Sequence, residues 1–292
     1  MVLRNQYCLS IADIGIEVET DLLHPEEDHF RPFITKEKAP DVRLRFRRVA
    51  QLPALSPGVI YEDNCYRVHG DGKGGYVRAF FDAPRDYTPY GVAAWNAAEK
   101  TVWVDYLEKG ISCIDGMSNS FFHLGLESIL PRQGRICIHA ACVDTSLGGI
   151  LFSGPSGIGK STQAELWCRY RGARQINGDR PILSKTEEGW LAWGSPYAGS
   201  SRCHVNACCP VTAIVMLRQS PVCRLRRMGS AEAFRAVWSG LTVPGWDAEA
   251  VDRALDLATE LATAIPVYEF GCTPDVVAVD YLESGLRKEW NK

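Results

Sequence analysis

The sequence lacks the segments that would place a protein in a membrane or in an oxidising compartment. Its longest apolar run is about eight residues, around positions 211–217, whereas a membrane-spanning helix needs ~20. The opening segment MVLRNQYCLSIADIGIEVET has no basic start followed by a continuous apolar stretch, so no secretory signal is expected. The eleven cysteines include no CxxC pair. We therefore expect reduced thiols in a cytoplasmic protein that has no membrane partner.

The sequence also lacks a strong charge of either sign. The net charge is −3, with 14 basic and 19 acidic side chains in residues 1–130 and with 18 and 16 in residues 131–292. A nucleic-acid surface usually shows as a strongly basic patch, so no nucleic-acid partner is expected. With 46% hydrophobic and 23% charged residues among 292, the composition is typical of a globular protein and excludes a disordered or coiled-coil chain.

Residues 1–130 are predicted to form a β-rich N-terminal domain that binds a substrate or a partner. Apolar and polar residues alternate in short runs, as in residues 41–48 and 101–107, which indicates antiparallel strands. Residues 117–130 have apolar side chains at helical spacing, and Pro131 is expected to end that helix. This helix leads into the second domain.

Residues 131–292 are predicted to form a mixed α/β catalytic domain. Strands are expected at residues 135–143, 149–152, around 182, 212–217 and 266–270, and helices at 160–170, 231–239, 248–264 and 274–286. The fold class is therefore α/β, and this domain follows the β-rich domain.

The segment ILFSGPSGIGKSTQAELW, residues 150–167, contains the GxxxxGKS pattern between an apolar run and a helical one. Its glycines allow successive backbone amides and the start of a helix to surround a phosphate group. We expect Lys160 to contact the β- and γ-phosphates of ATP and the Ser161 hydroxyl to bind Mg²⁺. A glycine-rich turn with a surface lysine is the alternative. The predicted nucleotide-binding residues are Gly154, Pro155, Ser156, Gly157, Ile158, Gly159, Lys160, Ser161 and Thr162.

A phosphate loop binds a nucleotide, but phosphoryl transfer also needs a carboxylate. Asp179 follows at the end of the segment ARQINGD, where one helix and a short return strand would bring it back beside the loop. We interpret Asp179 as the base for an acceptor hydroxyl or as a metal ligand, and a plain loop carboxylate beside Arg180 is the alternative. His139 lies in an apolar strand and is either a core histidine or a member of the same site.

Residues 138–184 resemble the catalytic domain of the HPr kinase/phosphorylase family, which is related in fold to phosphoenolpyruvate carboxykinase. In that family a histidine, the phosphate loop and a DDR acidic pair form one site, and His139, the loop and Asp179 with Arg180 stand at these positions. The resemblance implies His139, Lys160 and Asp179 as catalytic residues. It assigns to Asp179 the activation of the acceptor hydroxyl. It also implies that the same residues catalyse phosphorolysis of the product.

The sequence departs from that family at position 178, where glycine replaces the first aspartate of the pair. Metal binding should therefore depend more on Ser161 and phosphate oxygens, together with Asp179. The motifs HAA, GPSGIGKST, NGDRPIL, GSPYAGSS and TPD are more similar to HPr-kinase-like proteins found beside peptide natural-product genes, some of which phosphorylate a serine of a precursor peptide. The resemblance implies a serine of a peptide as the acceptor, with a small hydroxylated molecule as the alternative.

The loop GSPYAGSSR, residues 194–202, is small and rich in hydroxyl groups. Ser200 and Arg202 are candidate substrate-binding residues, because the loop could close over an acceptor and Arg202 could supply positive charge. A plain surface turn is an equally good interpretation. The nearby Cys203, His204, Cys208 and Cys209 lack the spacing of a zinc site.

These observations predict a kinase that uses ATP and Mg²⁺ to phosphorylate the hydroxyl group of a peptide or a small molecule. The alternative is a nucleotide-responsive binding module, in which the β-rich half binds a partner and no phosphoryl group is transferred. Asp179 separates the two hypotheses, because a pure sensor has no need of an acceptor base. The sequence leaves open whether the protein is a homo-oligomer.

Overall fold

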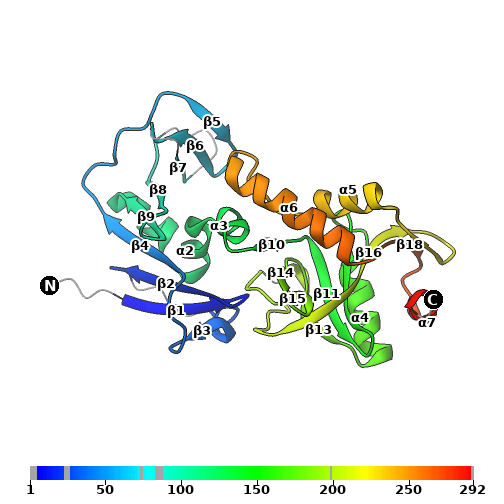
Figure 1. Cartoon of the computed structure of the whole chain (residues 1–292). Coiled ribbons are helices and arrows are strands. Elements are labelled where there is room, and N and C mark those ends of the chain that lie inside the picture. Colours follow the sequence, from blue (N-terminus) through cyan, green and yellow to red (C-terminus); the bar gives the residue numbers. More distant parts are fainter. Residues whose placement is uncertain (1–4, 23–26, 73–74, 83–87, 198, 291–292) are drawn as a thin grey trace. The chain divides into compact units, whose positions relative to one another are not determined.

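The computed structural model describes residues 5–22, 27–72, 75–82, 88–197 and 199–290, and the chain divides into two compact units (Figure 1). The first unit comprises Met1–Leu126 and Pro244–Ala248, and the second comprises Glu127–Val243 and Glu249–Lys292. Each unit is built on a large sheet with helices, so the structure is of the mixed α/β class. The roles expected for an N-terminal and a catalytic domain, divided at residue 130, stay predictions.

The first unit contains a nine-stranded sheet in the order β3-β1-β2-β4-β9-β8-β7-β6-β5. Its strands are β1 (Asn5–Ile11), β2 (Ile14–Thr20), β3 (Ile34–Thr35), β4 (Val42–Arg48), β5 (Val59–Glu62), β6 (Tyr66–Gly70), β7 (Tyr76–Phe80), β8 (Gly91–Asn96) and β9 (Thr101–Tyr106). The expectation of a wholly antiparallel sheet is wrong at β4, which is parallel to both β2 and β9. Long connections join β4 to these neighbours, and only long connections let adjacent strands run in one direction.

The first unit also contains short helices: η1 (Arg31–Phe33) lies between β2 and β3, and η2 (Glu108–Gly110), α1 (Ile111–Ile114) and α2 (Met117–Leu124) follow β9. The predicted single helix over 117–130 is wrong, because Gly125 adopts φ 68° and ends α2. Helix α3 (Leu126–Arg132) then begins and runs through Pro131. A proline removes only its own N–H from a helix, and α3 ends one residue later, so little hydrogen bonding is lost there.

The second unit is built on another nine-stranded sheet, whose main path is β10-β14-β15-β16-β12-β11-β13, with β18 beside β16 and β17 beside β18. Its strands are β10 (Arg135–Cys137), β11 (Ala140–Thr145), β12 (Gly148–Ser153), β13 (Arg174–Asn177), β14 (Ile182–Thr186), β15 (Gly189–Trp193), β16 (Cys208–Gln219), β17 (Arg224–Arg227) and β18 (Val267–Cys272). Strands β12, β16 and β18 are mutually parallel neighbours. Their carboxyl ends therefore meet at one edge, which is where open α/β sheets bind ligands.

Helices cover both faces of this second sheet, and they are α4 (Lys160–Arg171), α5 (Ser230–Gly240), α6 (Ala248–Ala264), α7 (Val276–Trp290) and the short η3 (Gly199–Ser201). Leu151 of β12 belongs to one buried cluster with α5 and α6. Its neighbours Ile150 and Phe152 belong to another cluster with α4 and α7. This alternation fixes β12, and the loop after it, between two helical layers. Within the described ranges, no helix combines the length and the hydrophobicity that a membrane span requires.

The strand predicted over residues 135–143 is interrupted at Ile138 and His139, which separate β10 from β11. Here the backbone bonds to other segments: the Ile138 N–H donates to the Pro181 carbonyl at 3.2 Å, and the His139 N–H donates to the Gly240 carbonyl at 2.7 Å. Because of this interruption, His139 does not follow the alternation of side chains between the two faces of a strand. Its side chain keeps 34% of its surface exposed, so the interpretation as a core histidine is wrong.

Candidate active site

The predicted phosphate loop connects the end of β12 to the start of α4. Gly154, Gly157 and Gly159 adopt φ values of 141°, 77° and 113°, which side-chain-bearing residues rarely tolerate. Gly159 precedes the helix, and no side chain caps the first turn of α4. The amides at this helix start are therefore available to an anion, and the helix dipole adds a positive potential. These are the backbone features that a phosphate-binding loop needs, and the binding of a nucleotide here stays a prediction.

The side chain of Lys160 is buried and folds back over the loop. Its ammonium group donates to the carbonyls of Gly154 at 3.1 Å and Pro155 at 3.2 Å. Burial lowers the pKa of this ammonium, while the negative charge of Asp179 opposes that shift. Because its partners are neutral carbonyls, a phosphate entering the loop offers the ammonium a stronger interaction than the one it has.

His139 and Asp179 form a pair beside this loop. The Nε2 atom of His139 lies 3.3 Å from Oδ1 of Asp179. The backbone carbonyl of His139 accepts a hydrogen bond from the Ser153 hydroxyl at 2.9 Å, at the last residue of β12. The carbonyl of Asp179 accepts from the Ala140 N–H at 2.9 Å. The pair is thus fixed to both β11 and the strand that leads into the phosphate loop.

The charges around His139 favour a neutral imidazole. Burial lowers the pKa of His139, and the positive charges of Lys160 and Arg180 lower it further, while Asp179 opposes them. At neutral pH the ring therefore keeps one N–H, which can donate to the Asp179 carboxylate. The neutral His139 ring can therefore orient the Asp179 carboxylate without cancelling its negative charge.

This lowered pKa predicts how the folding stability depends on pH. The native state binds a proton at His139 less readily than the unfolded chain, whose histidine pKa is close to 6.5. Stability should therefore fall as the pH drops through 6.5 towards the lowered value, and the His139→Gln variant should lack this part of the fall. Urea unfolding of both proteins at several pH values tests the prediction. Equal pH slopes for the two proteins would contradict it.

Asn177, which the sequence analysis did not single out, holds Asp179 in place. Its buried Oδ1 atom accepts the N–H groups of Asp179 at 2.9 Å and Arg180 at 2.7 Å. Its amide nitrogen donates to the carbonyls of Ser195 and Tyr197, both at 3.1 Å. The NGD sequence was the available signal, because asparagine followed by glycine is typical of a turn in which the side chain bonds the backbone ahead.

The Arg180 guanidinium is a second positive charge near the His139–Asp179 pair, in addition to the Lys160 ammonium. Its Nε atom lies 3.5 Å from Oδ2 of Asp179, and its NH1 group donates to the Thr242 hydroxyl at 2.5 Å. Thr242 lies just beyond the end of α5, and its own N–H donates to the Cys137 carbonyl. The Arg180 guanidinium is thereby held beside the carboxylate, where it can offset negative charge on a ligand.

The predicted substrate loop contacts Asp179 through one glycine. A Cβ atom added at Gly199 would lie 2.7 Å from the Asp179 Cβ, so η3 packs directly against this side chain. The side chain of Ser200 lies outside the described part of the structure. Arg202 is exposed with φ 52°, and no contact in the described residues joins it to Asp179 or Lys160. Its role in substrate binding stays a prediction.

A cavity of ≈ 650 Å³ adjoins the phosphate loop at the carboxyl ends of β16 and β18. Its walls combine apolar side chains with amides and hydroxyls, from Gly157, Ile158, Gly159, Thr162, Gln163, Gln219, Ser220, Pro221, Cys272, Thr273 and Pro274. Gln163 is buried, and its amide nitrogen donates to the Thr273 carbonyl at 3.1 Å. Its Oε1 atom is buried without a hydrogen-bond partner in the described structure. The cavity has the size and chemistry for a nucleoside attached to a phosphate in the loop.

No group of three or more His, Cys, Asp or Glu side chains in the described residues is arranged to hold a metal by itself. Cys203, His204, Cys208 and Cys209 form no such group, and all eleven cysteines are free thiols. The Ser161 hydroxyl and the Asp179 carboxylate are the oxygen donors that Mg²⁺ prefers, and phosphate oxygens would complete its shell. The donor set therefore fits an ion that arrives with a nucleotide.

Comparison with known proteins finds structural likenesses but no match to a family model or to a curated sequence. Among solved structures, the chain is similar to the HPr(Ser) kinase/phosphatase from Coxiella burnetii, over 53% of this chain and 92% of that one. The sequence identity is 14% and the TM-score is 0.32.

Proposed function

We propose that the protein transfers the γ-phosphoryl group of ATP to the hydroxyl group of an acceptor. The observation that carries the proposal is the His139–Asp179 pair, whose Nε2 and Oδ1 atoms lie 3.3 Å apart beside the phosphate loop. A positioned carboxylate next to an anion-binding loop is what phosphoryl transfer to an alcohol requires. The motif resemblance to HPr-kinase-like proteins supports a serine of a peptide as the acceptor.

In this mechanism the loop amides and Lys160 bind the phosphate groups, and the adjoining cavity binds the nucleoside. Asp179 accepts the proton of the acceptor hydroxyl as the oxygen forms a bond to the γ-phosphorus and the bond to the β-phosphate oxygen breaks. His139 orients the Asp179 carboxylate, and Arg180 offsets charge on the transferred group. ADP and the phosphorylated acceptor are the products. The same groups would serve phosphorolysis of the product: an oxygen of inorganic phosphate bonds to the phosphorus, the bond to the acceptor oxygen breaks, Asp179 returns a proton to that oxygen, and pyrophosphate leaves.

Ser161 and Asp179 would hold Mg²⁺ together with phosphate oxygens. When bound, the ion supplies neutralisation of the negative charge on the nucleotide. Of the two neighbouring positions 178 and 179, only 179 carries a carboxylate, because position 178 is glycine.

A transfer assay tests the proposal. Protein, Mg²⁺ and γ-labelled ATP are incubated with pools of serine peptides and of hydroxylated metabolites, and labelled products are identified by mass spectrometry. We expect labelled acceptor and an equal amount of ADP. Binding of ATP without transfer to any acceptor in either pool would instead favour the nucleotide-responsive binding module.

Restoring the carboxylate at position 178 should strengthen the dependence on the metal. Gly178 is not among the described glycines with positive φ, so the Gly178→Asp variant should fold normally. A second carboxylate near Asp179 should lower the Mg²⁺ concentration needed for half-maximal ATP binding by about tenfold. Titration of Mg²⁺ at fixed ATP measures this change. An unchanged Mg²⁺ requirement in a folded variant would mean that position 178 does not face the ion.

A further inference from the structure

A second feature of this unit lies at the edge of its sheet. Strand β17 pairs with β18 and with no other strand in the described residues. An edge strand presents unpaired N–H and C=O groups along its outer side, which can take an added strand. Four residues, RLRR, form this edge.

The register shows which backbone groups of β17 face outward. Met228, just after the strand, donates its N–H to the Val267 carbonyl of β18 at 2.8 Å. Counting back two residues at a time from Met228 gives Arg226 and then Arg224. These two lie opposite Glu269 and Gly271 of β18. In an antiparallel pair only alternate residues bond to the partner strand. The N–H and C=O groups of Leu225 and Arg227 therefore point away from β18, towards the open edge.

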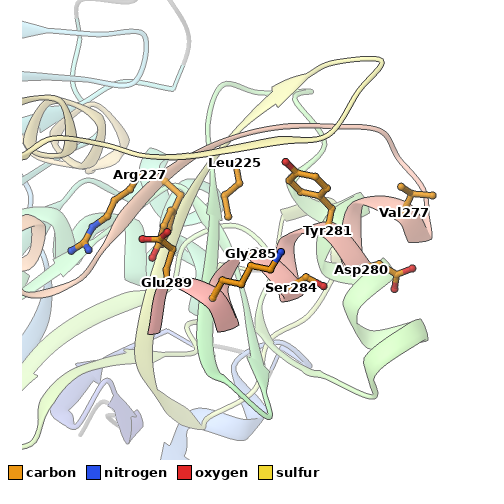
Figure 2. A pocket seen from close by; sticks show the side chains of 10 residues that line it. Leu225, Arg227, Val277, Asp280, Tyr281, Ser284, Gly285 and Glu289 are labelled. Atoms are coloured by element: carbon orange, nitrogen blue, oxygen red, sulfur yellow. The ribbon is translucent and has the colours of Figure 1, made fainter. Parts of the chain in front are cut away.

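The face of β17 that carries Leu225 and Arg227 borders a cavity against helix α7. The cavity measures ≈ 560 Å³, and Figure 2 shows Leu225 extending from the strand towards the helix that carries Tyr281 and Gly285. Val277 and Tyr281 of this helix are 57% and 44% exposed, which is unusual for large apolar side chains. A Cβ atom at Gly285 would lie 2.5 Å from Leu225, so the helix and the strand already approach closely there. An apolar side chain from an added strand could enter beside Leu225.

The opposite face of β17 is basic. Arg224 and Arg226 lie on it, and Arg226 is paired with Glu232 and Glu269. Arg224 is exposed and has no carboxylate partner among the described residues. A second copy of β17 added to this edge would bring arginines next to arginines, which is unfavourable for directly opposed side chains. The edge therefore disfavours self-association and is complementary to an acidic strand.

We propose that β17 binds an extended peptide in which acidic and apolar residues alternate. Its backbone pairs with the outward groups of Leu225 and Arg227, its carboxylates lie beside Arg224, and its apolar side chains enter the cavity between β17 and α7. This site goes beyond the proposed function, because peptide binding here does not require phosphoryl transfer. Its test contains no nucleotide, so the two proposals fail independently.

Fluorescence anisotropy with the full chain tests the site. The probe is a short fluorescein-labelled peptide of alternating glutamate and valine with a central phenylalanine. We expect saturable binding that the Arg224→Glu variant weakens by about tenfold, because an attraction becomes a repulsion. A peptide with lysine in place of glutamate should not bind. Equal binding of the two peptides would overturn the proposal.

The backbone contribution is measured with a matched pair of variants. Arg227→Ala and Arg227→Pro both remove the side chain, but only proline removes the outward N–H, and edge strands tolerate proline there. We expect the proline variant to bind the peptide about fivefold more weakly than the alanine variant. A probe methylated at alternate backbone nitrogens repeats the test on the unchanged protein and should not bind. Unimpaired binding of that probe, or self-association of the chain that Arg227→Pro abolishes, would refute the proposal.

Discussion

Replacing Lys160 with alanine is expected to weaken the binding of ATP with Mg²⁺ at least about a hundredfold, or ~2.7 kcal/mol, while the fold is retained. Hydrogen bonds to charged groups contribute ~1.5–3 kcal/mol each, and the ammonium is expected to contact two phosphate groups. Within the part of the chain that the structure describes, this ammonium donates to the carbonyls of Gly154 and Pro155 and to no other group. Removing a buried cation should therefore leave the packing intact. Calorimetric titration with ATP and Mg²⁺ measures the loss.

The matched control is Lys185→Ala, on β14 of the same unit. Lys185 is 55% exposed and forms an ion pair with Glu260, so this variant removes an equal charge away from the loop. It should bind ATP as the unchanged protein does. If Lys160→Ala also bound ATP with unchanged affinity, the phosphate-loop assignment would be wrong.

The parts of the candidate site that could be predicted from the sequence are contiguous in the chain. The loop between β12 and α4 follows from glycine spacing and from its apolar and helical flanks, all within residues 150–167. The return of Asp179 could also be anticipated, because one helix, α4, and one short strand, β13, are the regular elements between it and the loop. The local sequence pattern was enough to place Asp179 beside the loop, because one helix and one strand determine its position.

The rest of the site depends on segments that are distant in sequence. The interruption at His139 is set by a hydrogen bond to Gly240, about a hundred residues later, and Arg180 is held by Thr242. An apolar run such as RICIHAACV gives no sign of such partners, so it predicted one continuous strand. The parallel pairing of β4 could not be predicted either. The alternation of apolar and polar residues identifies a strand, but the direction of its neighbours depends on the connections between strands.

The Asp179→Asn variant separates a kinase from a sensor and should have the largest effect on chemistry. Asparagine keeps the size of the side chain and an oxygen that can accept from His139, 3.3 Å away, but it loses the charge and the basic oxygen. ATP affinity should stay within about tenfold, or ~1.4 kcal/mol. Phosphoryl transfer should fall at least about a hundredfold, since general bases contribute ~10²–10⁴-fold. Single-turnover transfer from labelled ATP, with a parallel binding titration, measures both quantities.

The control for this experiment is Asp144→Asn, which removes a carboxylate from β11, the strand that begins next to His139. It should change neither ATP binding nor transfer, because Asp144 lies near the far end of that strand, opposite Gly149 and Arg174. Transfer by Asp179→Asn at a rate close to that of the unchanged protein would exclude Asp179 as the acceptor base. If no acceptor is phosphorylated by the unchanged protein and Asp179→Asn alters only the binding of a partner, the carboxylate reports the nucleotide state instead, and the protein is a nucleotide-responsive binding module.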